Sequence, residues 1–421
     1  MRFQTQFLSI LCGLTLAFIA QVSQAGTLTL DKAISQAISA NPQIAAASAE
    51  AHAEHEAIKS NYSLDNPTVG FSTSHNMGLM QVQMGPMKVW SVSQKFKFPT
   101  EYFLSGKAQT ERAKAAEQQY LAKMLEVRRE LITRYYRLFA VNQILALLKA
   151  QRETLQEVAR SAEARHAVGT VPQQDELKAT EEQTMVDAEL ISEKEKQTAD
   201  EAKLNSIMAK PANAPIQLPS DDLPVPELTV SPTQVEQMAK TDSREIKAAQ
   251  FSVSSAATAK TLSAWKYAPN FTVSYHQAYD TNINAYSFGI GVSIPLWFFA
   301  KQNGDYEAAS ARAVRAQANL ENVRLATSSE VRSLVFDVTS HAQLLKIYKT
   351  SLIPQASTTL SSSRSAYRAG RTQFLELLDS ERSLYAVRVG YYQTLSQYID
   401  DLAKLESIVC HSVSTLPKEG M

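Results

Sequence analysis

Two acidic residues three positions apart, Glu376 and Asp379, are the strongest candidates in this sequence for chemistry with ions. Residues at that spacing share one face of a helix, so both carboxylates would point the same way. If several copies of the chain met around an axis, each position would become a ring of carboxylates that attracts cations. The simpler alternative is an acidic first turn stabilised by the helix dipole. The spacing alone is compatible with both interpretations.

A cluster of methionines is the second candidate. Met77, Met80, Met84 and Met87 crowd a short connection, with His75 beside them. Thioether groups are ligands for soft ions such as Cu(I) and Ag(I). A flexible apolar loop explains the same composition without a metal, and we favour it over the metal site.

A divalent-ion site is a weaker candidate. His52 and His55 lie three apart with Glu56 adjacent, a spacing at which imidazole and carboxylate could share one ion. The surrounding alanines and glutamates are typical of a solvated helix face, which we favour.

No other pattern indicates catalysis. The sequence has no glycine-rich phosphate loop, no paired-cysteine metal site and no His-Glu-x-x-His motif. Its 42 basic and 42 acidic residues balance, which argues against a nucleic-acid partner. We therefore predict neither an enzyme nor a cofactor.

The first residues are typical of an export signal. Arg2 precedes an apolar run over residues 7–22, and a small-residue cleavage site ends at Ala25. We predict that residues 1–25 are a signal peptide. Its removal would leave Cys410 without an intramolecular partner, so the exported protein would rely on packing instead of a disulfide.

Four segments alternate between large apolar and small polar residues, which predicts strands with one apolar face. They form two pairs, and the small face carries mostly Gly, Ser and Thr. The predicted strands cover about 68–76, 88–98, 270–279 and 286–296.

The chain also contains very long helical patterns. The 62 residues between Gly106 and Gly169 include neither Gly nor Pro and are rich in strong helix formers. A continuous helix of that size would be about 90 Å long, more than a globular core requires. The predicted helices cover about 107–168, 173–209, 305–369 and 374–408.

These elements recur after a shift of roughly 200 residues, which indicates an internal two-fold repeat. Pro67 recurs as Pro269, and Gly169 recurs as Gly370. Repeated prolines interrupt both helix and strand between the copies. The predicted divisions are a first repeat at 26–209, a Pro-rich connector at 210–232, a second repeat at 233–409 and a tail at 410–421.

Strands of about ten residues can cross a bilayer when tilted, although a soluble antiparallel sheet shows the same alternation. Four strands cannot close a barrel, and an open sheet edge is excluded from hydrocarbon. Two chains would give eight strands with a filled interior, whereas three would give twelve and leave room for a pore. A channel therefore favours a trimer.

Leu352-Ile353-Pro354, Tyr367-Arg368-Ala369-Gly370 and Leu377-Leu378-Asp379 together resemble the TolC-type outer-membrane efflux proteins. The resemblance implies a membrane α+β fold, in which a homotrimeric 12-strand outer-membrane β-barrel with four strands per chain continues into a long periplasmic α-helical barrel. It also implies a periplasmic adaptor protein, an inner-membrane pump of the RND type and outer-membrane lipid as partners. The similarity is nearest to the heavy-metal and cation efflux branch.

In this family the helices meet at a periplasmic tip where the pore is closed by polar and ionic links. Thr372 stands where the family has an arginine, and the nearest arginine lies one position earlier. Asp175 of the first repeat is a candidate acceptor. The resemblance thus places five residues at a gate: Tyr367, Arg371, Glu376, Asp379 and Asp175.

The sequence therefore predicts a passive trimeric duct in the outer membrane, the exit channel of a tripartite efflux system. Three alternatives are an exported coiled-coil protein without a pore, a type I protein-secretion duct and an autonomous nutrient porin. The cargo, the partner pump and the role of Cys410 do not follow from the residues.

Overall fold

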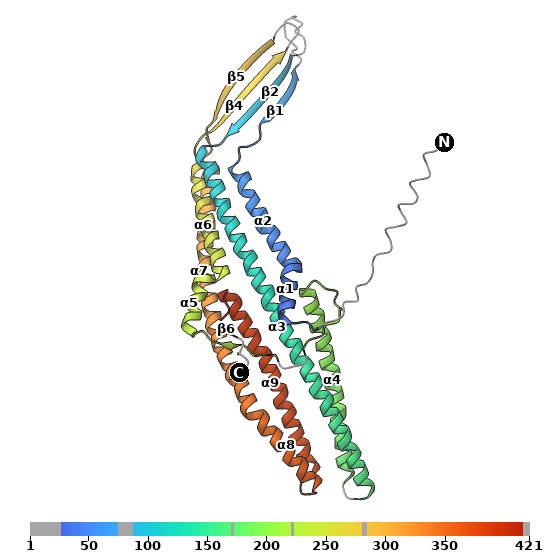
Figure 1. Ribbon diagram of the computed structural model, residues 1–421. Coiled ribbons are helices and arrows are strands. Elements are labelled where there is room, and N and C mark those ends of the chain that lie inside the picture. The colour runs from blue at the N-terminus through green and yellow to red at the C-terminus, as the bar shows by residue number, and fades with distance from the viewer. Residues whose placement is uncertain (1–26, 75–86, 170–171, 220–222, 280–283, 416–421) are drawn as a thin grey trace, which may run out of the picture.

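The structure is a computed structural model, and it describes residues 27–74, 87–169, 172–219, 223–279 and 284–415. The predicted signal peptide and most of the methionine-rich connection lie outside these residues. The molecule is strongly elongated, with a sheet at one end and two helical hairpin turns at the other (Figure 1). Among the described residues, no helix combines the length and apolar character needed to cross a membrane.

The sheet has four antiparallel strands in the order β1-β2-β4-β5. They are β1 (Thr68–Ser74), β2 (Met87–Phe96), β4 (Asn270–Tyr279) and β5 (Asn284–Ser293). The strand predicted to end at 98 stops at Phe96, since Phe98 and Pro99 already begin the next helix. The strand predicted over 286–296 covers Asn284–Ser293 instead. The central pair, β2 with β4, joins distant parts of the chain.

Register keeps the two kinds of side chain on opposite faces of the sheet. On one face Val92 pairs with Tyr275, which pairs with Phe288. On the other face Ser91 lies between Gly70 and His276. This second face is tight, because a Cβ atom at Gly70 would lie 2.7 Å from the Ser91 hydroxyl oxygen.

The long first helix, α3 (Pro99–Ala167), has 69 residues and would extend about 100 Å at ideal rise. It begins at Pro99 and not near residue 107, because proline fits the first helical position, where its missing N–H is not needed. Gly106 consequently lies inside the helix, where the ring of Tyr62 packs against it; a Cβ there would lie 2.3 Å from that ring.

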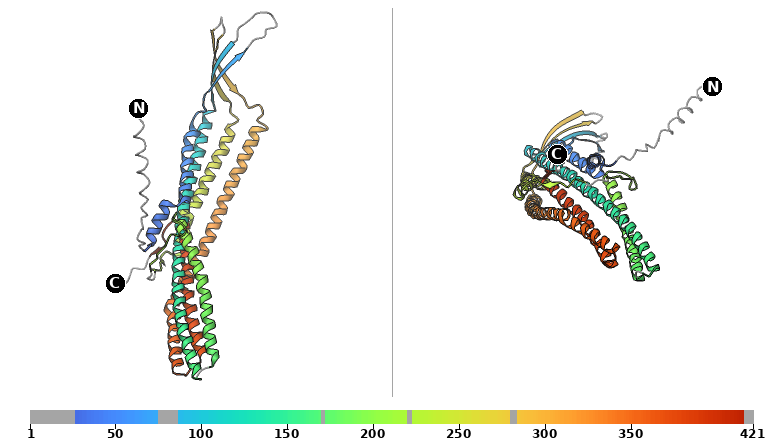
Figure 2. Two further views of the ribbon diagram at one scale, coloured as in Figure 1. Left: turned by 90° about the vertical axis from the view of Figure 1, so that its right-hand side faces the viewer. Right: turned by 60° about the horizontal axis from the view of Figure 1, so that its bottom comes forward.

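Next to the sheet, four helices lie side by side in one layer, which we call the helical layer (Figures 1 and 2). In order they are α2 (Pro42–Tyr62), α3, α6 (Arg244–Trp265) and α7 (Lys301–Ile347). Beyond the middle of the molecule α3 packs against α4 (Gln173–Ile207) and α9 (Phe374–Val409).

The helix predicted over 305–369 is not continuous. It begins at Lys301 and is divided by a short π-helix, η1 (Tyr348–Leu352), after which α8 (Ile353–Arg368) completes it. Pro354 lacks the N–H that an α-helix needs at this position, so the hydrogen-bond pattern changes just before it. Tyr348 packs here against Gly390 of α9, where a Cβ atom would lie 2.7 Å from the tyrosine hydroxyl.

Short elements cross the middle of the molecule, and we call them the belt. They are α1 (Leu30–Ala40), α5 (Pro232–Asp242), β3 (Glu227–Leu228) and β6 (Ser414–Thr415). The segments predicted as connector and tail thus contain structure, because β3 and β6 pair with each other. The Tyr398 hydroxyl donates to the carbonyl of Pro226 at 2.5 Å, which fastens the connector to α9.

The largest core lies where the belt crosses α3, α4, α7 and α9. Tyr135, Phe139, Leu131 and Tyr398 are almost completely buried there. A second core near the hairpin turns includes Leu148, Leu155, Phe374 and Leu378. The molecule therefore has its tightest packing at the belt and near the helical end, whereas the sheet leaves one apolar face exposed.

Candidate gate at the helical end

Two hairpin turns lie together at the end of the molecule farthest from the sheet (Figure 1). Gly370 ends α8 with a φ of +69°, and Gly169 follows α3 with a φ of +72°. At Gly370 the amide of Arg371 donates to the Ala366 carbonyl at 2.9 Å, and the glycine amide donates to Tyr367 at 3.0 Å. This is the Schellman arrangement, which requires the left-handed conformation that glycine adopts without strain.

Tyr367 is buried in this structure and does not extend into solvent. Its ring lies 6.1 Å from that of Phe374, the first residue of α9. Both rings belong to the second core, together with Leu148 of α3 and Ala179 of α4. Tyr367 therefore contributes to the packing that joins the two hairpins.

Glu376 and Asp379 are exposed on α9, as a shared helix face predicts. The Thr372 hydroxyl donates a short hydrogen bond to the Glu376 carboxylate. Asp379 lies 3.8 Å from Arg382. Arg371 is exposed and forms no ion pair within the described part of the chain. In one chain, Glu376 acts as a residue of the first helical turn, and any role as a carboxylate ring depends on other copies.

Asp175 lies in the first turn of α4, on the other hairpin. Partial burial raises the pKa of its carboxyl, so it takes up a proton more readily on acidification than a free aspartate. In the described structure Asp175 makes no ion pair with Arg371 or with any other cation. The proposed acid and the proposed cation are therefore not brought together within one chain.

The actual links between the hairpins were not predicted. Arg382 of α9 forms an ion pair with Glu182 of α4, whose side chain is only 6% exposed. One turn further along α9, the Tyr385 hydroxyl donates to Glu189 at 3.1 Å. Burial, followed by the neighbouring Glu189 carboxylate, raises the pKa of Tyr385. These two side-chain contacts connect α9 to α4 near the turns.

The missed residues carry a faint signal in the sequence. Glu182 and Glu189 are seven apart, which places them on one face of α4 in a coiled-coil geometry. Arg382 and Tyr385 are three apart on α9. Charged and polar residues at such positions are common on solvated helices, so spacing alone does not distinguish a partner from a surface charge.

Within the second hairpin, Arg364 of α8 contacts Glu381 of α9 with two nitrogens, at 2.6 and 3.1 Å. Within the first hairpin, Arg152 of α3 lies 2.5 Å from Asp187 of α4. An ion pair thus connects the two helices within each hairpin, whereas the contacts of Arg382 and Tyr385 join one hairpin to the other.

The sequence profile of the outer membrane efflux protein family matches residues 33–210 and again residues 235–411. The chain belongs to this family. A curated relative is the cobalt-zinc-cadmium resistance protein CzcC of Cupriavidus metallidurans, which is 23% identical over 396 residues, 91% of this chain and 90% of CzcC.

Two solved outer-membrane proteins have a similar fold. The outer membrane protein VceC of Vibrio cholerae has a TM-score of 0.77 at 17% identity, over 91% of this chain and 95% of VceC. The CmeC outer membrane channel of Campylobacter jejuni has a TM-score of 0.81 at 12% identity, over 93% of this chain and 87% of CmeC.

Family membership makes this chain an outer-membrane efflux channel protein, with its long helices extending into the periplasm. The resemblance stated from the sequence motifs is thereby confirmed. The family is one of transport proteins and not of enzymes. An exported coiled-coil protein without a pore is no longer needed to explain the helices.

The structure describes the two candidate metal sites to different extents. Met77, Met80 and Met84 lie outside the described residues, and Met87 is an exposed residue at the start of β2. Glu56 pairs with Lys59 at 2.7 Å, and this contact lowers its pKa. A lysine neighbour favours the solvated helix face over an ion shared with His52 and His55. No group of three His, Cys, Asp or Glu side chains that could hold a metal ion occurs among the residues described.

Proposed function

We propose that the chain forms a homotrimeric passive duct, the exit channel of a tripartite efflux system. The observation that carries the proposal is the sheet. Within the described residues its edge strands, β1 and β5, are each paired on one side only, and one face of the sheet is apolar and exposed. Such edges cannot remain open in hydrocarbon. Three sheets of four strands would close into a twelve-strand barrel wide enough for a pore.

The helices support self-association in the same way. α7 is the last helix of the helical layer, and its outer edge exposes Val314, Leu325 and Phe336, with Phe336 74% exposed. On α4, Leu177 and Ile191 are exposed by 61% and 74%. Isolated apolar residues are common on surfaces, but rows along a helix edge suit burial against another copy.

An internal repeat explains how three chains would make a nearly six-fold wall. The family profile matches the chain twice, and the two matches cover corresponding elements. β1 and β2 correspond to β4 and β5, α2 to α6, and α4 to α9. The helix α3 corresponds to α7 continued by α8. Each chain would therefore supply two similar units.

We further propose that the helical end is the gate of this duct. Tyr367, Arg371, Glu376, Asp379 and Asp175 all lie on or beside the two hairpin turns. Glu376 and Asp379 are exposed and would form two carboxylate rings in a trimer. The contacts of Arg382 and Tyr385 would hold each pair of hairpins in the closed arrangement.

Replacing both acids, as Glu376→Gln with Asp379→Asn, is expected to reduce cation preference roughly several-fold, because fixed carboxylates concentrate cations at a pore entrance. Reversal potentials in planar bilayers with a salt gradient measure this preference. Glu195→Gln with Glu201→Gln removes two acids elsewhere on α4 and serves as the control. Unchanged reversal potentials in the double variant, with conductance intact, would remove these two acids from the pore lining.

The proposed cargo is a divalent metal ion, supported by the relative named for cobalt, zinc and cadmium resistance. The partners would be a periplasmic adaptor and an inner-membrane pump of the RND type. Deleting the gene should increase sensitivity to these ions, and the intact chain should restore resistance. Sensitivity confined to other compounds, or a block in secretion of a protein, would assign a different cargo.

The duct itself is tested with purified protein. Detergent-solubilised material should migrate as a heat-modifiable trimer and should conduct ions in planar bilayers with a low resting conductance. A water-soluble extended dimer without conductance contradicts the proposal. A high resting conductance that needs no adaptor would indicate an autonomous porin.

A further inference from the structure

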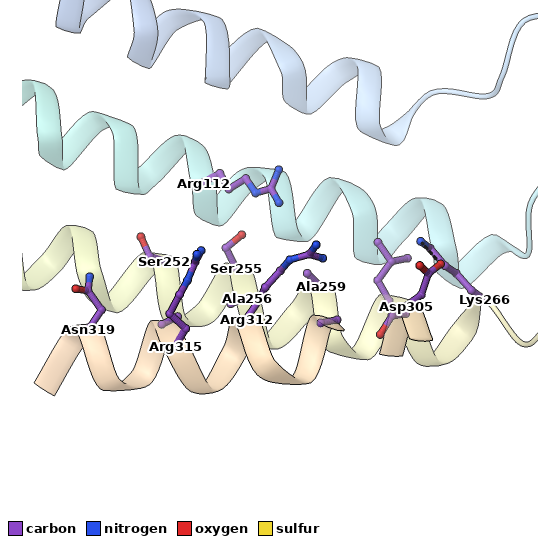
Figure 3. Close-up of a pocket in the computed structure, with 14 residues that line it drawn as sticks. Arg112, Ser252, Ser255, Ala256, Ala259, Lys266, Asp305, Arg312, Arg315 and Asn319 are labelled. Atoms are coloured by element: carbon purple, nitrogen blue, oxygen red, sulfur yellow. Dashed lines mark ion pairs between the residues drawn. The ribbon is translucent and has the colours of Figure 1, made fainter. Parts of the chain in front are cut away.

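A groove lined by arginines lies on the helical layer, close to the sheet and far from the gate. Its lining comes from α3, α6 and α7 and encloses a volume of about 700 Å³. Figure 3 shows Arg112 of α3 and Arg312 and Arg315 of α7 extending into the same space alongside α6. The three guanidinium groups thus come from the two helices that border the groove.

The side of the groove formed by α6 is built from small residues, which leaves room above it. Ser252, Ser255, Ala256 and Ala259 line it in successive turns. Ser255 is buried, and its hydroxyl donates to the Ala108 carbonyl of α3 at 2.9 Å, which holds the two helices together. Larger residues on this face of α6 would fill the space between the arginines.

The charge of the groove is not balanced by its own residues. Its lining holds Arg112, Arg312, Arg315 and Lys266 against one acid, Asp305, a net charge of +3 from four cations minus one anion. Lys266 and Asp305 pair with each other at 3.6 Å. None of the three arginines forms an ion pair with any residue in the described ranges.

The groove opens on the side of the helical layer opposite the belt. The belt helix α5 and residues Arg324 and Ser328 of α7 line the same cavity, so these two residues lie on the side of α7 that faces the belt. Ser328 lies sixteen residues after Arg312, which at 100° per residue places them about 160° apart around the helix. If the layers of three chains close with the belt outside, the groove faces the lumen. This orientation rests on the proposed function, whereas the groove itself belongs to a single chain.

We propose that this groove is a binding site for multivalent oxyanions such as phosphate. A guanidinium group can donate two parallel hydrogen bonds to such an anion. Three guanidinium groups together attract the anion more strongly than a single cation would. In the trimer three such sites would form a positively charged ring in the part of the lumen near the sheet. Its charge would be opposite in sign to that of the acids at the gate. Bound oxyanions would neutralise this ring and so allow cations to pass it.

The test measures inorganic phosphate binding by isothermal titration calorimetry on the purified full-length protein at low ionic strength. The variant Arg112→Gln, Arg312→Gln, Arg315→Gln should bind phosphate at least about tenfold more weakly than the wild type. The matched control, Lys178→Gln, Lys196→Gln, Arg324→Gln, removes three cations that each already pair with an acid three residues away. It should bind like the wild type.

Three results would overturn the proposal: no phosphate binding by the wild type, equal affinity in the arginine variant, or an equal loss in the control. If the triple variant does not fold, as judged by circular dichroism, the single variant Arg312→Gln decides the question with a smaller expected loss. In planar bilayers the triple variant should also shift selectivity towards cations. Absence of any conductance would count against the duct, while the binding measurement still decides the groove.

Discussion

Replacing Ile290 by lysine is expected to abolish most of the folded protein in the outer membrane. Ile290 lies in the middle of β5, 71% exposed on the apolar face and paired with Val273. A lysine facing lipid near the bilayer midplane costs about 2–4 kcal/mol, and a trimer would carry three of them. The measurement is the amount of heat-modifiable trimer in outer-membrane fractions.

The control for this substitution lies on the same strand. Ser287→Lys adds the same charge on the opposite, small-residue face, where Ser287 pairs with His276. A lysine there would point into a water-filled interior, so trimer yield should stay close to that of the wild type. Equal yields for the two variants, or equal losses, would show that the apolar face does not contact lipid.

Arg382→Ala should open the helical end. The substitution leaves the Glu182 carboxylate, which is 6% exposed, without its partner. Breaking a buried ion pair costs about 3–5 kcal/mol, and we expect about 1–3 kcal/mol here because Arg382 itself is half exposed. Resting conductance should rise, and amide exchange should accelerate in the adjoining turns of α4 and α9.

A second variant separates the loss of the link from the loss of charge. Arg382→Gln combined with Glu182→Gln leaves two neutral side chains that can hydrogen-bond, so the increase in conductance should be smaller than for Arg382→Ala. If Arg382→Ala keeps the resting conductance and exchange rates of the wild type, the hairpins are held mainly by the apolar contacts of Tyr367 and Phe374.

Elements with a strong local pattern were predictable from the sequence. Strand β4 was predicted with its observed bounds, because Phe271, Val273 and Tyr275 alternate with small residues without interruption. The long helices were predictable because runs such as residues 107–168 and 305–353 contain neither Gly nor Pro. The pairing of β2 with β4 was not, since each strand shows only its own alternation and nothing in it specifies a neighbour far along the chain.

Departures from the prediction have local physical causes. Pro99 starts α3, eight residues before the predicted start near residue 107. At the π-helix before Pro354, Tyr348 packs against Gly390, which is remote in sequence. Gly106 and Gly304 occupy matching positions in the two repeats, yet only Gly106 has a close neighbour, so the match in sequence hid different surroundings.

At the gate, the sequence indicated the turns and the exposed acids but not the contacts between hairpins. Gly370 and Gly169 mark the ends of long helical patterns in the sequence. The spacing of Glu376 and Asp379 indicates that they share one helix face. The partner of a charged residue depends on how two hairpins pack, as Arg382 with Glu182 illustrates. A family motif likewise identifies Tyr367 but does not show that its ring is buried.

The strand order of the sheet also constrains how the protein matures. β2 cannot find its central partner β4 until both halves of the chain have left the ribosome and crossed the inner membrane. Before that, β1 and β2 form only a two-stranded hairpin, which is marginally stable in water. Even the finished sheet keeps two unpaired edges, a template for wrong pairing. Maturation should therefore contain a step whose rate depends on protomer concentration, in competition with aggregation, and a periplasmic chaperone would determine which of the two prevails.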